Sequence, residues 1–347
     1  MSMQQIVRNW AAMKTVAVVV LATASISVFG ADFSKSPKIT LRITSASPPG
    51  MEDSKALTDT VEFLKKATDG TVTLQPFYSS ALFDEIAGMG AVQSGLIDMA
   101  VACTCNMTKQ TNAYLFADVP YLWNEMDNGR KVWNGPIGEK IGKEISAKLG
   151  MIPVAYTPSG GGYRILWNTK RPLKVPADVK GIKIRTTATP IEQEFWKRTG
   201  GVPTPVDVKE IYTALQQGLV DAEHLQPVWL TLLKHDEVVK YGTEIGALAV
   251  YRVLVIGQKS YDKMDAAQKQ AFKEAMKFYE DKAYAYNRSL RDTALQQVKS
   301  RGIEVYVPTA AEMKQWRDYG TEFMQSDVVS SSVSKETIEA AIKAQGG

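Results

Sequence analysis

Alternating apolar and polar residues predict a β-strand over residues 39–44, because successive side chains of a strand point to opposite faces. Residues 53–67 follow, with Leu57 and Leu64 among apolar positions three or four apart, which is the spacing of an amphipathic helix. Residues 72–78 return to a strand pattern. This strand–helix–strand order predicts an α/β fold.

An internal repeat is the clearest feature of the middle of the chain. Residues 91–98 (AVQSGLID) and 214–221 (ALQQGLVD) are identical at five of eight positions, and each copy follows a Glu-Ile pair. Each copy predicts a helix that ends near its Gly, followed by a strand that starts at its Asp. The repeat suggests two lobes built on one plan. Chance similarity between two helix ends is the alternative, since Gly is common there.

The second half predicts a connection between these lobes. The mostly apolar run at 246–257 predicts an extended strand, and residues 265–301 have the pattern of one long helix. A short helix at 312–323 and a loose tail beginning near Ser330 are expected after it. Because the run at 246–257 can pass through both lobes, we expect the chain to cross between them more than once. The expected division is 32–160 plus 250–290 for the first lobe and 161–249 plus 291–345 for the second.

The first 30 residues have the composition of an export signal. Arg8 and Lys14 are the only charges, and an uncharged, mostly apolar run at 15–29 precedes Gly30 and Ala31. A basic segment, a short apolar segment and small residues describe a cleaved signal peptide. A retained anchor is the alternative, but the run is shorter than the roughly 20 residues that a spanning helix needs. We therefore expect cleavage after Gly30 or Ala31 and a soluble periplasmic protein.

Composition excludes several classes of protein. The 347 residues are 45% hydrophobic and 22% charged, with a net charge of +4, which is typical of a folded soluble chain and weakly disfavours a nucleic-acid binder. Two His and two Cys argue against a soft-metal site and allow at most one disulfide. No cofactor is expected.

Motifs for catalysis are missing. The chain has neither a Gly-x-Ser-x-Gly motif nor a phosphate-binding Gly-rich loop with Lys, and the Gly-rich segment 159–162 predicts a flexible turn. Cys103 and Cys105 flank Thr104; structural thiols are favoured, and a disulfide across one residue is sterically awkward, although export would allow oxidation. A periplasmic enzyme using Cys103 or Glu85 would need a base nearby, which nothing in the sequence provides.

Two arginines are candidates for anion binding. Arg164 follows a Gly-rich segment, and Arg185 ends the strand pattern 182–185. A guanidinium at a strand end can bind a carboxylate through two parallel hydrogen bonds. Taken alone, an arginine in such a position is more often a solvated surface residue.

The sequence resembles the substrate-binding proteins of tripartite ATP-independent periplasmic (TRAP) transporters in three segments, 180–185 (KGIKIR), 200–205 and 210–221. The resemblance extends from the first strand through the long helix. It implies a two-lobe, periplasmic-binding-protein-like α/β fold with a hinge and a long connecting helix. It also implies a non-enzymatic receptor that binds a small organic acid and delivers it to a membrane permease; a receptor that feeds a sensor protein is the alternative.

The resemblance also implies a set of ligand contacts. Arg185 occupies the position of the family's carboxylate-binding arginine, and Arg164 matches an assisting one. The first lobe is expected to contribute the loop ending at Ser47, the turn at Glu85 and the segment 102–106. The sequence departs from the family after Arg185 and after Asp221, which leaves the rest of the ligand open. The predicted ligand-binding residues are Arg185, Arg164, Glu85, Ser47, Cys103, Asn106, Trp167, Thr187, Gln226 and Trp229.

The predicted ligand is a 2-oxo, 2-hydroxy or aromatic monocarboxylate. Thr187 and Gln226 could bind an oxygen beside the carboxylate, and Trp167 and Trp229, with Tyr163 and Phe83, could provide apolar area. A C4-dicarboxylate, the alternative, would need a further cationic anchor, and no third arginine is evident in the motif region. Glu223 with Gln226 is a weak candidate for holding a hard cation.

Overall fold

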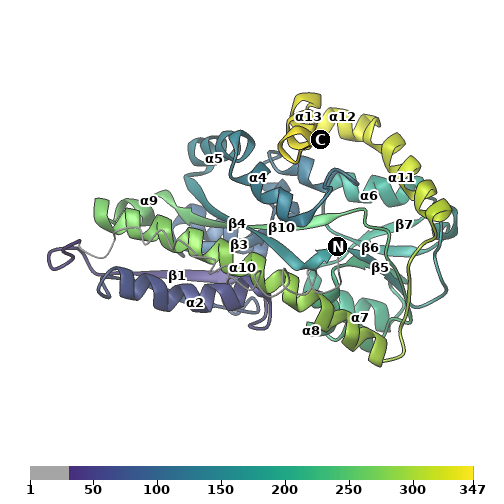
Figure 1. Cartoon of the computed structure of the whole chain (residues 1–347), viewed down its shortest axis with the longest axis horizontal. Coiled ribbons are helices and arrows are strands. Elements are labelled where there is room, and N and C mark those ends of the chain that lie inside the picture. The colour runs from purple at the N-terminus through teal and green to yellow at the C-terminus, as the bar shows by residue number, and fades with distance from the viewer. Residues whose placement is uncertain (1–30, 347) are drawn as a thin grey trace, which may run out of the picture. The chain divides into compact units, whose positions relative to one another are not determined.

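Two mixed β-sheets organise the part of the chain that the computed structural model describes, residues 31–346 (Figure 1). Both sheets belong to one compact unit, Phe33–Gly347. The predicted signal peptide, residues 1–30, lies outside the described residues. Within the described range, no helix combines the length and apolarity needed to cross a bilayer.

The first sheet has five strands in the order β2–β1–β3–β10–β4. Strand β1 pairs in parallel with β2 and β3, whereas β10 is antiparallel to β3 and β4. The apolar run predicted at 246–257 forms β10, which therefore joins strands from the first half of the chain. The strands are β1 (Ile39–Ser45), β2 (Val72–Phe77), β3 (Met99–Cys103), β4 (Met151–Tyr163) and β10 (Ala249–Gly257).

The second sheet has six strands in the order β11–β9–β5–β8–β6–β7. Strand β6 is parallel to β7 and β8, β5 is antiparallel to β8 and β9, and β11 is parallel to β9. The bounds of the two lobes given above stay a prediction. The strands are β5 (Ile165–Asn168), β6 (Lys183–Thr186), β7 (Val202–Pro205), β8 (Ala222–Leu225), β9 (Tyr241–Thr243) and β11 (Glu304–Tyr306).

The internal repeat has the same structural role in both sheets. The Asp98 carboxylate accepts the backbone N–H of Arg42 at 3.0 Å, and the Asp221 carboxylate accepts that of Lys183 at 3.1 Å. Each repeat aspartate therefore fixes the parallel strand beside its own, β1 in one sheet and β6 in the other. The helices that precede the repeat aspartates are α3 (Glu85–Ser94), before β3, and α7 (Ile211–Gln216), before β8. They are followed by Gly95 and Gly218 in the left-handed conformation.

The long helix α10 (Ala266–Ser300) contacts elements connected to both sheets. Its first turn is capped reciprocally by Asp265 and Gln268. It packs against α2 (Glu52–Ala67), β4 and α8 (Pro227–Leu232), and Figure 1 shows it passing from α2 to α8. Most of the predicted apolar face is buried, namely Phe272, Met276, Tyr279 and Ala283.

The predicted loose tail is wrong, because the chain continues as two further helices after Met324. Val329, Val333 and Ala341 are buried in the main apolar cluster, and the Gln345 side chain donates to the Leu122 carbonyl at 3.0 Å. Serine-rich composition therefore did not prevent docking. The remaining helices are α4 (Gly129–Trp133), α5 (Pro136–Leu149), α6 (Pro190–Arg198), α9 (Gln258–Asp262), α11 (Ala310–Met324), α12 (Asp327–Ser332) and α13 (Lys335–Ala344).

Candidate ligand-binding site

Two adjoining cavities, of about 190 and 40 Å³, contain most of the predicted ligand contacts. They share Glu85, Asn106, Arg185, Thr187 and Val208. The larger cavity lies beside the N-terminus of α3 and the end of β6. The smaller cavity is lined by Glu85, Cys103, Cys105, Asn106, Ser159, Arg164, Arg185, Thr187, Val208, Leu225, Gln226, Trp229, Val250 and Arg252.

Arg185, near the end of β6, is a buried cation without an ion-pair partner among the described residues. The side chain lines both cavities, and the residue is 6% exposed. Its Nε donates to the Val206 carbonyl at 2.9 Å. Burial lowers the pKa of Arg185, an effect that the charge of Glu192 only partly offsets. The guanidinium is therefore desolvated and available to an anion.

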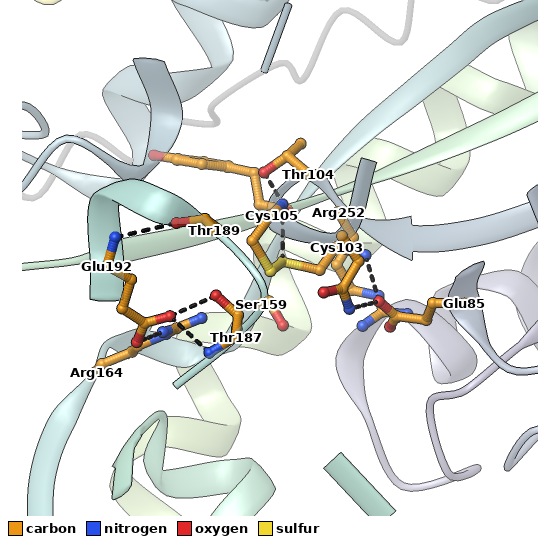
Figure 2. Close-up of a disulfide and its surroundings, with 12 residues drawn as sticks. Glu85, Cys103, Thr104, Cys105, Ser159, Arg164, Thr187, Thr189, Glu192 and Arg252 are labelled. Atoms are coloured by element: carbon orange, nitrogen blue, oxygen red, sulfur yellow. Dashed lines mark hydrogen bonds and ion pairs between the residues drawn. A yellow bond between two sulfur atoms is a disulfide. The ribbon is translucent and has the colours of Figure 1, made fainter. Parts of the chain in front are cut away.

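Arg164, by contrast, is already paired. Its Nη1 lies 2.6 Å from the Glu192 carboxylate of α6, which also accepts the Thr187 N–H at 3.0 Å and the Thr187 hydroxyl (Figure 2). Burial raises the pKa of Glu192, but Arg164 and the Thr187 hydroxyl outweigh burial, so the pKa lies below its ordinary value. Arg164 lines the smaller cavity with its charge neutralised.

Arg252, which was not predicted, is the third arginine of the site. It lies in β10, 2% exposed, and pairs with Asp53 at 3.1 Å and with Glu85 at 2.8 Å. Its guanidinium also lies 5.6 Å from the Trp229 ring. Burial lowers its pKa, but the two carboxylates raise it further, above the ordinary value. A single charge inside the apolar run 246–257 was the signal that could have identified it.

Glu85 contacts Cys103 and Asn106, which lie 18 and 21 residues further along the chain. One Glu85 oxygen accepts the Cys103 N–H at 2.9 Å and the Asn106 side-chain amide at 2.7 Å. Glu85 is the first residue of α3, whose Asp84 cap accepts the Ala87 N–H, so the positive end of the helix dipole also favours its charge. The carboxylate thus links α3 to the end of β3.

Cys103 and Cys105 form a disulfide, so the prediction of two structural thiols is wrong (Figure 2). Thr104 starts a 3₁₀ turn, which brings the two Cα atoms to 5.1 Å, within the usual range for a disulfide. An extended chain would have placed them further apart. The disulfide packs with Val250 as a small apolar cluster.

Two predicted ligand contacts, Ser47 and Trp167, and the weak cation candidate Glu223 lie outside both cavities. The Ser47 hydroxyl donates to Asp53 at 2.7 Å, and Ala46 lines the larger cavity in its place. Trp167 is fully buried, with its indole N–H donating to the Leu225 carbonyl at 2.9 Å. Glu223 is also fully buried, with both oxygens 3.0 Å from His235.

A common reason places Trp167 and Glu223 away from ligand. They pair with one another in the register of β5 and β8, and the next same-face pair, Ile165 with Leu225, lies nearer the strand ends that form the site. Trp167 and Glu223 are therefore buried one side-chain layer below the residues at the strand ends, too deep to contact a ligand. Glu223 forms its contacts with His235, so its carboxylate is not available to bind a cation together with Gln226. Neither Tyr163 nor Phe83 lines the two cavities.

Gln226, the cap residue of α8, and Trp229, within α8, both line the smaller cavity. The Trp229 indole donates to the Ser159 hydroxyl at 3.1 Å. The adjoining Gly160 belongs to β4 rather than to a flexible turn, and its N–H donates to Glu52 at 2.7 Å. A Cβ at Gly160 would lie 2.4 Å from Gln226 and 2.7 Å from Trp229, so only glycine allows this approach.

Buried titratable groups surround the arginines. Burial raises the pKa of Asp118 to about 7, against the opposing effect of Arg164. Burial and the neighbouring Asp53 raise the pKa of Glu52 to about 8. Burial and Arg164 lower the pKa of His224 to about 3, so this histidine is neutral at pH 7. The site therefore contains three fixed arginine charges, while some nearby carboxyls are partly protonated near neutrality.

A family model described as bacterial extracellular solute-binding protein, family 7, matches residues 44–328. A solute-binding protein of Verminephrobacter eiseniae is 30% identical over 68% of this chain and 70% of its own length. The 2,3-diketo-L-gulonate-binding periplasmic protein of Escherichia coli is 30% identical over 70% of this chain and 74% of its own length.

A solved structure gives the same result for the fold. A TRAP periplasmic solute-binding protein of Bordetella, with density interpreted as pantoate, superposes with a TM-score of 0.79 at 27% identity, covering 88% of this chain and 99% of that chain. The two-lobe α/β fold predicted from the sequence is thus confirmed. The chain belongs to family 7 of the bacterial extracellular solute-binding proteins, which are the organic-acid receptors of TRAP transporters.

Proposed function

We propose that this chain is an extracytoplasmic receptor for a small 2-hydroxy or 2-oxo monocarboxylate, which it delivers to a TRAP permease. The observation that supports this most directly is the buried, unpaired charge of Arg185 between the two cavities. A ligand carboxylate would supply the missing partner. In a closed, water-excluding site, this ion pair is stronger than it would be in bulk solvent.

The charge balance favours one carboxylate over two. Arg164 is neutralised by Glu192, and Arg252 is neutralised by Asp53 and Glu85. A dicarboxylate would leave its second charge without a free cation, which is costly in a buried site. The third arginine therefore does not restore the dicarboxylate alternative.

The remaining groups suggest the shape of the ligand. Asn106, Thr187 and Gln226 offer polar atoms for an oxygen beside the carboxylate, whereas Leu225 and Trp229 offer apolar area. With Trp167 in the core and only 40 Å³ in the smaller cavity, a compact aliphatic body suits the site better than an aromatic ring. Pantoate and 2,3-diketo-L-gulonate, named for the relatives above, both carry an oxygen on the carbon beside the carboxylate.

The test is to identify what the protein binds. Acid released from purified, denatured protein is identified by mass spectrometry, and the folded protein is titrated calorimetrically with pantoate, lactate, pyruvate, phenylpyruvate, succinate and glucuronate. Binding of the aliphatic 2-hydroxy or 2-oxo acids in preference to succinate is expected. Binding of succinate alone would reject the ligand class, and binding of none of these or of any released acid would reject the receptor function.

A further inference from the structure

The Cys103–Cys105 disulfide lies in the wall of the smaller cavity, between two groups of charged residues. Both cysteines line this cavity, and they are 6% and 2% exposed. Figure 2 shows the Glu85–Arg252 pair beside Cys103 and the Arg164–Glu192 pair across from it. With Val250, the two cysteines form a small apolar cluster in the wall of a cavity that charged residues also line.

Hydrogen bonds from residues 103 and 104 connect this disulfide to Glu85 and to β10. The Cys103 N–H donates to Glu85, which also holds Asn106. The Thr104 hydroxyl donates to the Tyr251 carbonyl of β10 at 3.2 Å. The ring closed by the sulfurs comprises residues 103–105, which include the start of the turn that presents Asn106 to both cavities.

We propose that the Cys103–Cys105 disulfide is a specificity-determining contact of the ligand site: its sulfurs face the apolar part of the bound acid, and its closure holds Asn106 in place. This inference rests on the proposed receptor function. Sulfur is polarisable and packs well against aliphatic groups. Without the disulfide, the turn gains conformational freedom that ligand binding would have to remove.

The contact can be removed chemically. A dithiol reductant attacks one sulfur as a thiolate, forms a mixed disulfide and releases the other cysteine thiolate. Its second thiol then closes the reagent's own disulfide and releases the first cysteine. Two electrons pass to the protein, and two protons from solvent give two cysteine thiols. Because the chain has only two cysteines, any effect of reduction on binding originates at this site.

The experiment compares pantoate with glycolate, a 2-hydroxy acid that lacks the apolar body. Calorimetry is performed on oxidised protein, on protein reduced with dithiothreitol and on the double variant Cys103→Ala, Cys105→Ala. Reduction is expected to weaken pantoate about tenfold and glycolate by less than about threefold, the cost of roughly one ordered hydrogen bond with its packing. The double variant should resemble the reduced protein and be insensitive to dithiothreitol, with melting curves confirming that it is folded.

Ligand protection provides a second measurement that does not depend on the variant. The rate of reduction is followed by alkylation and mass spectrometry, with and without pantoate. At about ten times its Kd, pantoate should slow reduction about tenfold, because only free protein would react.

The outcomes separate the two proposals. If oxidised protein binds pantoate but reduction changes neither affinity nor the pantoate-to-glycolate ratio, and pantoate leaves the rate of reduction unchanged, the disulfide is not a ligand contact. If oxidised protein binds neither acid nor any other in the panel, the proposed function fails and this inference fails with it.

Discussion

Replacing each of the two predicted arginines by glutamine should change stability in opposite directions. Arg185 is buried without an ion pair, whereas Arg164 is buried against Glu192 at 2.6 Å. Arg185→Gln removes a desolvated charge, and glutamine can still donate to the Val206 carbonyl. Arg164→Gln leaves the Glu192 carboxylate buried without its cation.

The magnitudes follow from these environments. Leaving one partner of a buried pair alone costs about 3–5 kcal/mol, which we expect for Arg164→Gln. Removing the unpaired charge of Arg185 should raise the free energy of unfolding of the ligand-free protein by about 1 kcal/mol. Binding should respond differently, because the ligand carboxylate loses its partner in Arg185→Gln. That loss is about 2–5 kcal/mol, or about 30- to several-thousand-fold in affinity.

Urea unfolding monitored by circular dichroism gives the stability of both variants without ligand, and calorimetry gives their affinity for the best acid of the panel. Arg185→Gln should be at least as stable as the wild type and should bind poorly. If it loses as much stability as Arg164→Gln, or binds within about threefold of wild type, Arg185 is a structural charge and the site has been misassigned.

Three further outcomes test the surroundings of the site. Gly160→Ala should destabilise the protein more than Gly181→Ala. Both glycines have positive φ, but of the two only Gly160 would place a Cβ against another side chain, Gln226 at 2.4 Å. Thermal melting of the two variants measures the difference. Arg252→Gln should cost about 3–5 kcal/mol in urea unfolding and abolish acid binding, because two buried carboxylates lose their cation; a small loss would contradict the pairing. Folding raises the pKa of Asp118 from its ordinary 3.8 to about 7, so the folded state binds more protons and its stability falls as pH rises through that interval. Asp118→Asn should remove this pH dependence and stabilise the protein at pH 8 more than at pH 5, and equal effects at both pH values would refute it.

Much of the fold could be predicted from the sequence because local patterns agreed with the tertiary structure. The alternating residues near 39–44 and the apolar run at 246–257 became β1 and β10, and the long helix followed its apolar spacing. The repeat aspartates have matching hydrogen bonds in two sheets. The prediction of a loose tail was wrong because the C-terminal helices are held by packing against residues distant in sequence. Local composition contains no information about that packing.

The site was less accessible to sequence reasoning because burial depth and pairing depend on register. Trp167 lies two positions after Ile165, the first residue of β5, and its side chain is therefore buried in the core instead of facing the site. The difference between Arg164 and Arg185 depends on Glu192, which belongs to a separate helix. The disulfide depended on a 3₁₀ turn that begins between its cysteines, and a strand pattern that ends at Cys103 gives no indication of it.

The pattern of paired and unpaired arginines suits a receptor that must release what it binds. If all three guanidinium groups were free, an anion would be held by several desolvated charges, and each would be left uncompensated on release. Here Glu192 neutralises Arg164, while Asp53 and Glu85 neutralise Arg252, so departure of a carboxylate exposes one unpaired charge rather than three. The paired arginines still provide the donors and the rigid walls that orient the acid. In the proposed function, affinity would depend on a single ion pair at Arg185, and contact with water would weaken that pair, which would favour release of the acid.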